Sequence, residues 1–334
     1  MMKENQSGEK KSKTKIVAVA GIVVTVGLVL AAGVGASVRE RRSRDKALDT
    51  LASDEHIQQL LGEYDPDGAF LVEYGLAQGD DISAFYEDYE RTVDVIGTVV
   101  HEEFHEYSKT TDGYERLYMG EENSLDVPYT EVYHTKKMSG SVPDQCQTLR
   151  FDTYISEPSS GLAANEYGAY GLLNEFCAYS WGMNNTICMR PYYETFSDSV
   201  DTWRTWISLG ASDRMAYAEF KYYILHYLQY AKKHYPQVYE GIMANEAFKT
   251  VYTQTEARFA DAIAEYEKEL HSMDKKLSHI GTTVTLQGEG RIQIDRWFED
   301  FGDSIDLLYD EYAVLLEELQ KPKYVKLHEA LTGV

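Results

Sequence analysis

A run of 23 residues without a charged side chain, IVAVAGIVVTVGLVLAAGVGASV at 16–38, constrains this chain more than any other feature. A helix of that length reaches about 34 Å, enough to cross the hydrocarbon core of a bilayer. The sequence therefore predicts a transmembrane anchor at 16–38, between a basic tail at 1–15 and a charged juxtamembrane linker at 39–50. A cleaved signal peptide is the alternative, but the run exceeds the usual length, and arginines follow where small residues would favour cleavage.

The remainder of the chain is strongly acidic. Residues 1–46 hold ten basic and four acidic side chains, which leaves 22 basic and 51 acidic ones in 47–334, a formal charge of −29. This excess argues against nucleic acid as a partner, because phosphate contacts need clustered Lys and Arg. Five basic residues on each side of the apolar run leave its orientation open under the positive-inside rule. An acidic body, 51–334, behind one anchor favours a single-pass cell-membrane protein with an extracytoplasmic body.

The periodicity of the body predicts an α+β fold that is predominantly helical. Ser83 is expected to cap a helix that continues through Phe104, and helical spacing returns near 164. Further helices are predicted at 199–208, 212–235, 245–277 and 297–320, the last stopped by Pro322. Short β-prone runs predict strands: GAFLVEYGL near 68–76, then ERLYMG, TEVYHTKK and QTLRFDTYIS between 114 and 156, and a hairpin, TVTLQGEGRIQI, at 283–294.

The segment HEEFH at 101–105 raises the question of a metal site. On a helix, His101 and His105 are separated by about 400°, so both imidazoles project from one face and can reach a single cation. Glu102 lies about 100° from His101, close enough to reach a water on that cation without binding the cation itself. This is the HExxH arrangement, in which two neutral imidazoles hold zinc and the Glu acts as general base.

A catalytic zinc needs a third protein ligand and one position left for water. The continuation HExxHxxGxxH is excluded, because Ser108 and Thr111 stand where it needs Gly and His. A glutamate from a second helix is the other common solution. Two N-E-x-x-A-Y hexapeptides offer Glu166 and Glu175, which would face opposite sides of one continuous helix. Glu175 is favoured by its apolar neighbours, whereas Glu166 has the setting of a helix-start residue, and the choice between them stays open.

With these residues the chain resembles the gluzincin metallopeptidases, whose pattern is HExxH on one helix and N-E-x-x-A or N-E-x-x-S on a later one. The resemblance implies a zincin-like catalytic core at about 80–235, with 236–334 as a helical C-terminal part. It implies that His101, His105 and Glu175 bind Zn²⁺ and that Glu102 is the base. Better-known members place a multi-stranded sheet before the HExxH helix, whereas this chain leaves only about 35 residues there, so its sheet is expected mainly from 114–155.

The function implied is a membrane-anchored zinc peptidase that hydrolyses peptide or protein substrates with a zinc-activated water. Tyr179, one turn beyond Glu175, is a candidate for stabilising the oxyanion or orienting a ligand. The predicted strand RFDTYIS offers an edge for an extended substrate. Other candidate oxyanion donors are His134, Arg190, Tyr192 and Tyr193.

The alternative function is a non-catalytic surface binding protein with a structural or vestigial metal site. The three cysteines have no CxxC spacing, which excludes a four-thiolate zinc site and leaves open whether Cys177 and Cys188 pair. Substrate sequence, endo or exo cleavage, and oligomeric state are not determined by these residues.

Overall fold

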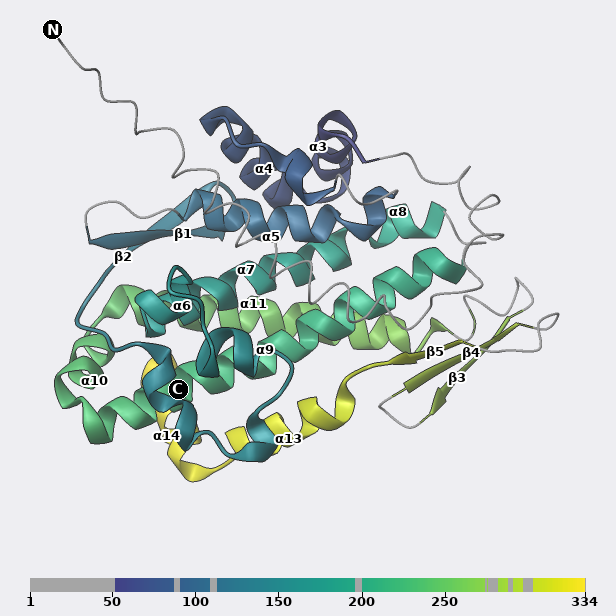
Figure 1. Cartoon of the computed structure of the whole chain (residues 1–334). Helices are drawn as coiled ribbons and strands as arrows, with labels where there is room; N and C mark the ends of the chain where they lie inside the picture. Colours follow the sequence, from purple (N-terminus) through teal and green to yellow (C-terminus); the bar gives the residue numbers. More distant parts are fainter. Residues whose placement is uncertain are drawn as a thin grey trace, which may run out of the picture.

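The computed structural model describes residues 52–86, 91–108, 113–195, 200–273, 275, 282–287, 291–296 and 303–333. The anchor predicted at 16–38 lies outside these ranges. Within them, no helix combines the length and the apolar character needed to cross a bilayer. The described fold is predominantly helical with two small antiparallel sheets, which agrees with the expected α+β class (Figure 1).

The elements follow one another along the chain with short connections. The helices are α3 (Asp54–Tyr64), α4 (Pro66–Gln78), α5 (Ile96–Tyr107), α6 (Ala163–Glu166), α7 (Ala169–Cys188), α8 (Arg190–Thr195), α9 (Val200–His234), α10 (Pro236–Met243), α11 (Glu246–Leu270), α13 (Tyr309–Leu319) and α14 (Pro322–Thr332). The strands are β1 (Tyr114–Gly120), β2 (Asn123–Pro128), β3 (Thr282–Gln287), β4 (Arg291–Arg296) and β5 (Asp303–Asp306).

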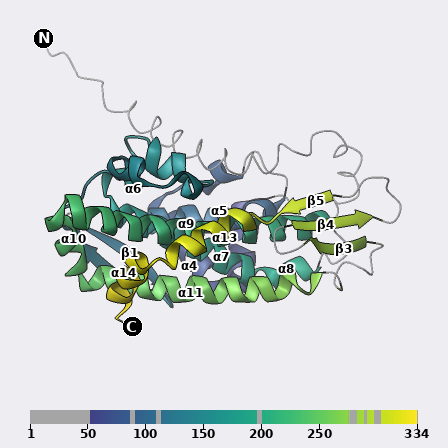
Figure 2. The same ribbon diagram turned by 90° about the horizontal axis from the view of Figure 1, so that it is seen from below.

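Helix α7 is the centre of the structure. It packs against α5, α9 and α11, and most of its side chains are buried (Figures 1 and 2). Helices α3 and α4 cover the other side of α5, while α13 and α14 pack along α9. A residue on α7 can therefore face α5 on one side of the helix or α11 on another.

The stretch GAFLVEYGL belongs to helix α4, so the strand predicted there is wrong. Asp65 caps the helix by accepting a hydrogen bond from the backbone N–H of Gly68, and Pro66 occupies the first turn, where its missing N–H costs nothing. Gly79 ends the helix at φ 89°, a conformation that favours glycine. The caps decide the element here, because the apolar residues alone suit either structure.

The helix that carries HEEFH begins later than predicted. Asp81, not Ser83, is the cap, and it starts only a short 3₁₀ turn at Ile82–Phe85. A second 3₁₀ turn at Thr92–Asp94 is held by Arg91, which pairs with Asp94 and donates to Thr205 on α9. These contacts fix the chain in turns, and α5 starts at Ile96.

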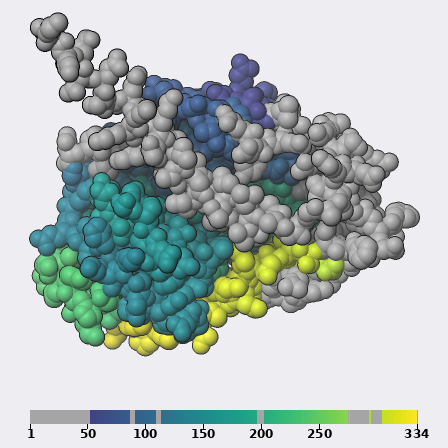
Figure 3. All heavy atoms as spheres, viewed as in Figure 1, coloured from purple at the N-terminus to yellow at the C-terminus, as the bar shows by residue number. Residues whose placement is uncertain are grey.

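The 114–156 region contains one hairpin rather than a larger sheet. ERLYMG forms β1, which pairs with β2 in antiparallel register. TEVYHTKK and QTLRFDTYIS are not strands: Thr135–Ser141 is a 3₁₀ helix and Asp152–Ser156 a π-helix. The buried pair of Arg150 with Glu219 on α9 pins this segment to the helices. It forms the teal surface in the space-filling view (Figure 3), and no edge for a substrate exists in it.

The predicted helix around 161–183 is interrupted. Gly168 adopts φ 56°, and a Cβ at this position would clash with the Tyr227 hydroxyl and the Tyr133 carbonyl. The chain therefore breaks between α6, which ends at Glu166, and α7, which carries Glu175.

The C-terminal third is not wholly helical, as the sequence had predicted. The hairpin expected at 283–294 is confirmed by the antiparallel pairing of β3 with β4, to which β5 adds a third strand. Pro322 begins α14 instead of ending a helix, because a helix tolerates proline in its first turn. The two helices predicted on either side of 209–211 are one helix, α9.

The core is rich in tyrosine. Buried Tyr133 and Tyr227 stack with centroids 3.9 Å apart, and each donates its hydroxyl to the other's carbonyl oxygen. Tyr266 and Tyr193 likewise donate to the carbonyl oxygens of Ile207 and Val93. Each hydroxyl finds an acceptor, so these rings bury apolar area without leaving a polar group unpaired.

Candidate metal centre

Helix α5 presents both histidines of HEEFH toward α7. Its fully buried residues Val99, Val100 and Phe104 fix the rotation of the helix. His101 is 9% exposed, and Glu102 is 5% exposed. The four-residue spacing brings the Nε2 atoms of His101 and His105 to 3.1 Å from each other, as the helical geometry requires.

Glu175 of α7 completes a group of three ligand atoms. Its Oε2 lies 3.9 Å from Nε2 of His101 and 3.6 Å from Nε2 of His105, and the three residues form a group able to hold a metal ion. Atoms bonded at about 2.0–2.2 Å to one tetrahedral zinc lie roughly 3.3–3.6 Å from one another. The observed separations of 3.1, 3.6 and 3.9 Å bracket that range, so the donor set fits a tetrahedral ion with a fourth position free.

A hydrogen-bonded chain orients His105. Asn174 donates through its Nδ2 to Glu115 on β1 at 2.6 Å, which leaves its Oδ1 to accept. That oxygen lies 2.5 Å from Nδ1 of His105, so Nδ1 carries the proton and donates it. The lone pair of His105 is therefore on Nε2, the nitrogen that faces Glu175, which is the tautomer a metal ligand needs.

Tyrosines and an arginine surround the carboxylate of Glu175. Tyr154, from the π-helical segment, donates its hydroxyl to Glu175 Oε2 at 3.2 Å. The ring of Tyr179 packs edge-on against that of His101, with centroids 4.5 Å apart. The Arg150 guanidinium lies 4.5 Å from the centre of the Tyr179 ring and is neutralised by Glu219. Tyr154 thus takes the position beside the carboxylate that the sequence had offered to Tyr179.

Burial dominates the electrostatics of the group. Burial, with the charges of His105 and Arg150, holds the pKa of His101 well below its usual value, so this imidazole is neutral. Burial also lowers the pKa of His105, but the charge of Glu175 and the hydrogen bonds outweigh it, and the net shift is upward. Burial raises the pKa of Glu102 to about 7, with His105 opposing and Glu175 adding to the shift. A carboxyl with a pKa near neutrality is matched to accepting and returning a proton.

Other sequence candidates lie elsewhere. Glu166 is exposed on α6 and is not in the metal-capable group. The remaining candidate donors are engaged: His134 with the carbonyl of Asn165, Arg190 with Glu269, Tyr192 with the ring of His56, and Tyr193 with the carbonyl of Val93. Cys146, Cys177 and Cys188 are free thiols, so the possible Cys177–Cys188 bond is not formed.

Sequence reasoning missed four residues around the group: Glu115, Arg150, Tyr154 and Asn174. Asn174 carried a signal, because it precedes Glu175 in the hexapeptide and a position about 100° round the helix can still face α5. Glu115 and Tyr154 carried none, since each comes from a different element and meets the site only after folding.

Comparisons with known proteins add no relative. No family model, no curated protein and no solved structure matches this chain.

Proposed function

We propose that the chain is a zinc-dependent peptidase of the gluzincin type, with the predicted segment 16–38 anchoring it to a membrane and the body extracytoplasmic. The observation that carries the proposal is the convergence of His101, His105 and Glu175 at separations suited to a tetrahedral ion, beside the buried carboxyl of Glu102. This combination supplies both parts of the HExxH chemistry, a ligand set and a base.

Each residue has a chemical task in this proposal. His101 and His105 present lone pairs, and Glu175 presents an anionic oxygen that Tyr154 holds in place. A bound zinc ion supplies Lewis acidity, lowering the pKa of a coordinated water to about 7. Glu102 accepts the proton when the attacking oxygen adds to the peptide carbonyl, and returns it to the departing amine. Tyr179 and Tyr154 are the hydroxyl-bearing side chains nearest the ligands and are the proposed donors to the developing oxyanion.

The test uses the full-length chain in detergent. Elemental analysis is expected to find about one zinc per chain, and a diverse peptide library is expected to be cleaved. Glu102→Gln should retain the zinc and lower kcat/KM by about 10²- to 10⁴-fold, the range for loss of a general base. Glu166→Gln is the matched control, because this glutamate is exposed and outside the group.

The outcomes separate the proposal from its alternative. Zinc-loaded wild-type protein that cleaves no peptide overturns the peptidase function and favours a non-catalytic binding protein. Equal loss of activity in both variants also contradicts the role assigned to Glu102.

A further inference from the structure

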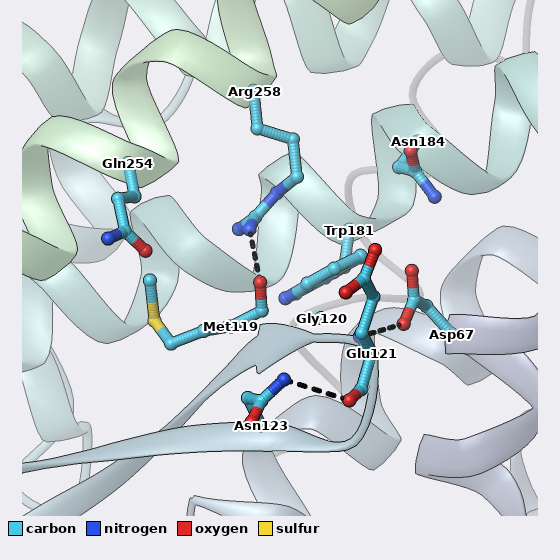
Figure 4. Close-up of a pocket in the computed structure, with 9 residues that line it drawn as sticks. All are labelled: Asp67, Met119, Gly120, Glu121, Asn123, Trp181, Asn184, Gln254 and Arg258. Atoms are coloured by element: carbon cyan, nitrogen blue, oxygen red, sulfur yellow. Dashed lines mark hydrogen bonds between the residues drawn. The ribbon is translucent and has the colours of Figure 1, made fainter.

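A second polar site lies on another side of α7. A pocket of about 370 Å³ opens between the β1–β2 hairpin, α4, α7 and α11 (Figure 4). None of the three candidate metal ligands lines it. Arg258 of α11 reaches into it, and Asp67 and Glu121 stand at its opposite wall.

Arg258 is a cation held in place without a carboxylate. Its guanidinium lies 3.9 Å from the centre of the Trp181 ring and donates to Ser180 Oγ at 2.8 Å and more weakly to the Met119 carbonyl at 3.5 Å. Within the described residues no carboxylate lies within 4 Å of it, and burial lowers its pKa to about 10. The fork has five N–H groups, so donors remain for a planar acceptor in the pocket.

The other arginines in comparable settings are paired. Arg150, Arg190 and Arg214 each have a glutamate oxygen within 3.4 Å. A partly buried guanidinium that stacks on tryptophan but lacks such a partner is suited to an anionic group brought by a ligand, because the fork matches a carboxylate with two parallel hydrogen bonds.

The facing wall supplies negative charge. Asp67 Oδ1 accepts from the Tyr118 hydroxyl and from the backbone N–H of Glu121. Asp67 raises the pKa of Arg258 through its charge, yet the two form no ion pair. The two charges therefore interact across the pocket with room for a ligand between them.

The hairpin tip adds a second carboxylate in a strained backbone. Glu121 and Glu122 adopt φ 51° and 59°, where hairpins usually place Asn and Gly. Such strain persists only where surrounding contacts impose it, and it concentrates at binding sites. Asp67 imposes it here by anchoring the tip, which directs Glu121 toward the pocket (Figure 4).

We propose that this pocket binds a small zwitterion of the amino-acid class, with its carboxylate on the Arg258 guanidinium and its ammonium group at Asp67 and Glu121. The pocket has the two opposite charges that such a ligand needs and a volume that admits one molecule of this size. The site is independent of the zinc centre, because the two share no residue.

The experiment titrates the full-length chain in detergent with each of the twenty common L-amino acids by calorimetry, up to about 10 mM. At least one is expected to bind. Its N-acetyl derivative, which lacks the ammonium charge, and its amide, which lacks the carboxylate, should each bind at least about tenfold more weakly, the loss of one charged contact.

Variants locate the binding. Arg258→Gln should weaken it at least about tenfold and Arg258→Lys less, because lysine keeps the charge and loses the fork. Arg116→Gln is the matched control, since Arg116 is exposed and pairs with Asp126 outside the pocket. Should Arg258→Gln not fold, the exposed Glu121→Gln decides, with an expected loss of similar size.

Three results overturn the proposal: no amino acid binds, the blocked derivatives bind as tightly as the free amino acid, or the pocket variants bind as the wild type does. The zinc content of each variant should equal that of the wild type, so failure here leaves the proposed peptidase function untouched.

Discussion

The two sides of α7 treat their polar groups differently. On the side that faces α5, each key group has a partner: His105 binds Asn174, Asn174 binds Glu115, and Glu175 accepts from Tyr154. On the side that faces the hairpin and α11, Arg258 confronts carboxylates across a pocket without pairing with them. A network with its hydrogen bonds made holds atoms at fixed separations, which a metal requires, whereas unpaired charges leave their bonds to an exchangeable ligand.

The largest expected effect concerns the buried ion pair on the metal side. Arg150 and Glu219 are 2.8 Å apart, with side chains 1% and 0% exposed. Arg150→Met leaves the carboxylate of Glu219 buried without its cation, and the free energy of unfolding should fall by about 3–5 kcal/mol. Chemical denaturation measures it. Arg116→Met, which removes an exposed pair, should change stability by no more than about 1 kcal/mol, and similar values for both variants would break the comparison.

Removal of the carboxylate ligand comes next. Glu175→Ala should lower zinc affinity by about 10²- to 10³-fold, because one of three protein ligands is lost from a site whose total binding free energy is of order 10 kcal/mol. Competition with a chelator gives the dissociation constant. Glu166→Ala should bind zinc as the wild type does, and the reverse result would transfer the ligand role to Glu166.

A smaller effect is expected where Asn174 supports His105. Asn174→Ala removes the acceptor at Nδ1 and leaves Glu115 without its donor. Loss of such an outer partner typically costs about 10- to 100-fold in metal affinity, measured by the same chelator competition. Unchanged affinity would show that packing alone orients the imidazole.

The smallest effect is expected on the other side of α7. Arg258→Gln should change the free energy of unfolding by only about 1 kcal/mol, because the lost stacking on Trp181 is offset by removal of a desolvated charge. Zinc affinity should not change. A loss as large as that of Arg150→Met would make Arg258 a structural group and erase the difference between the two sides.

Local patterns predicted part of this structure. The helical spacing of His101 and His105, the helix at Glu175 and the hairpin at 283–294 follow from interactions within a few residues. The same reasoning failed for 147–156, whose β-prone residues form a π-helical segment because Arg150 pairs with Glu219 and Tyr154 reaches Glu175, partners far away in the chain. It also missed the break at Gly168, which the Tyr227 hydroxyl imposes.

By itself the sequence determined which side chains share a helical face, because the period of the backbone fixes the directions of residues four apart. It also determined the contrast between an uncharged N-terminal run and an acidic body. Only the tertiary structure decided that Glu175 rather than Glu166 stands beside the histidines and that Glu115 and Tyr154 support them. It alone placed Arg258 across from Asp67. The physical reason is that a buried polar group takes its stability from the partner it meets, and here those partners come from segments that approach one another only when the helices pack.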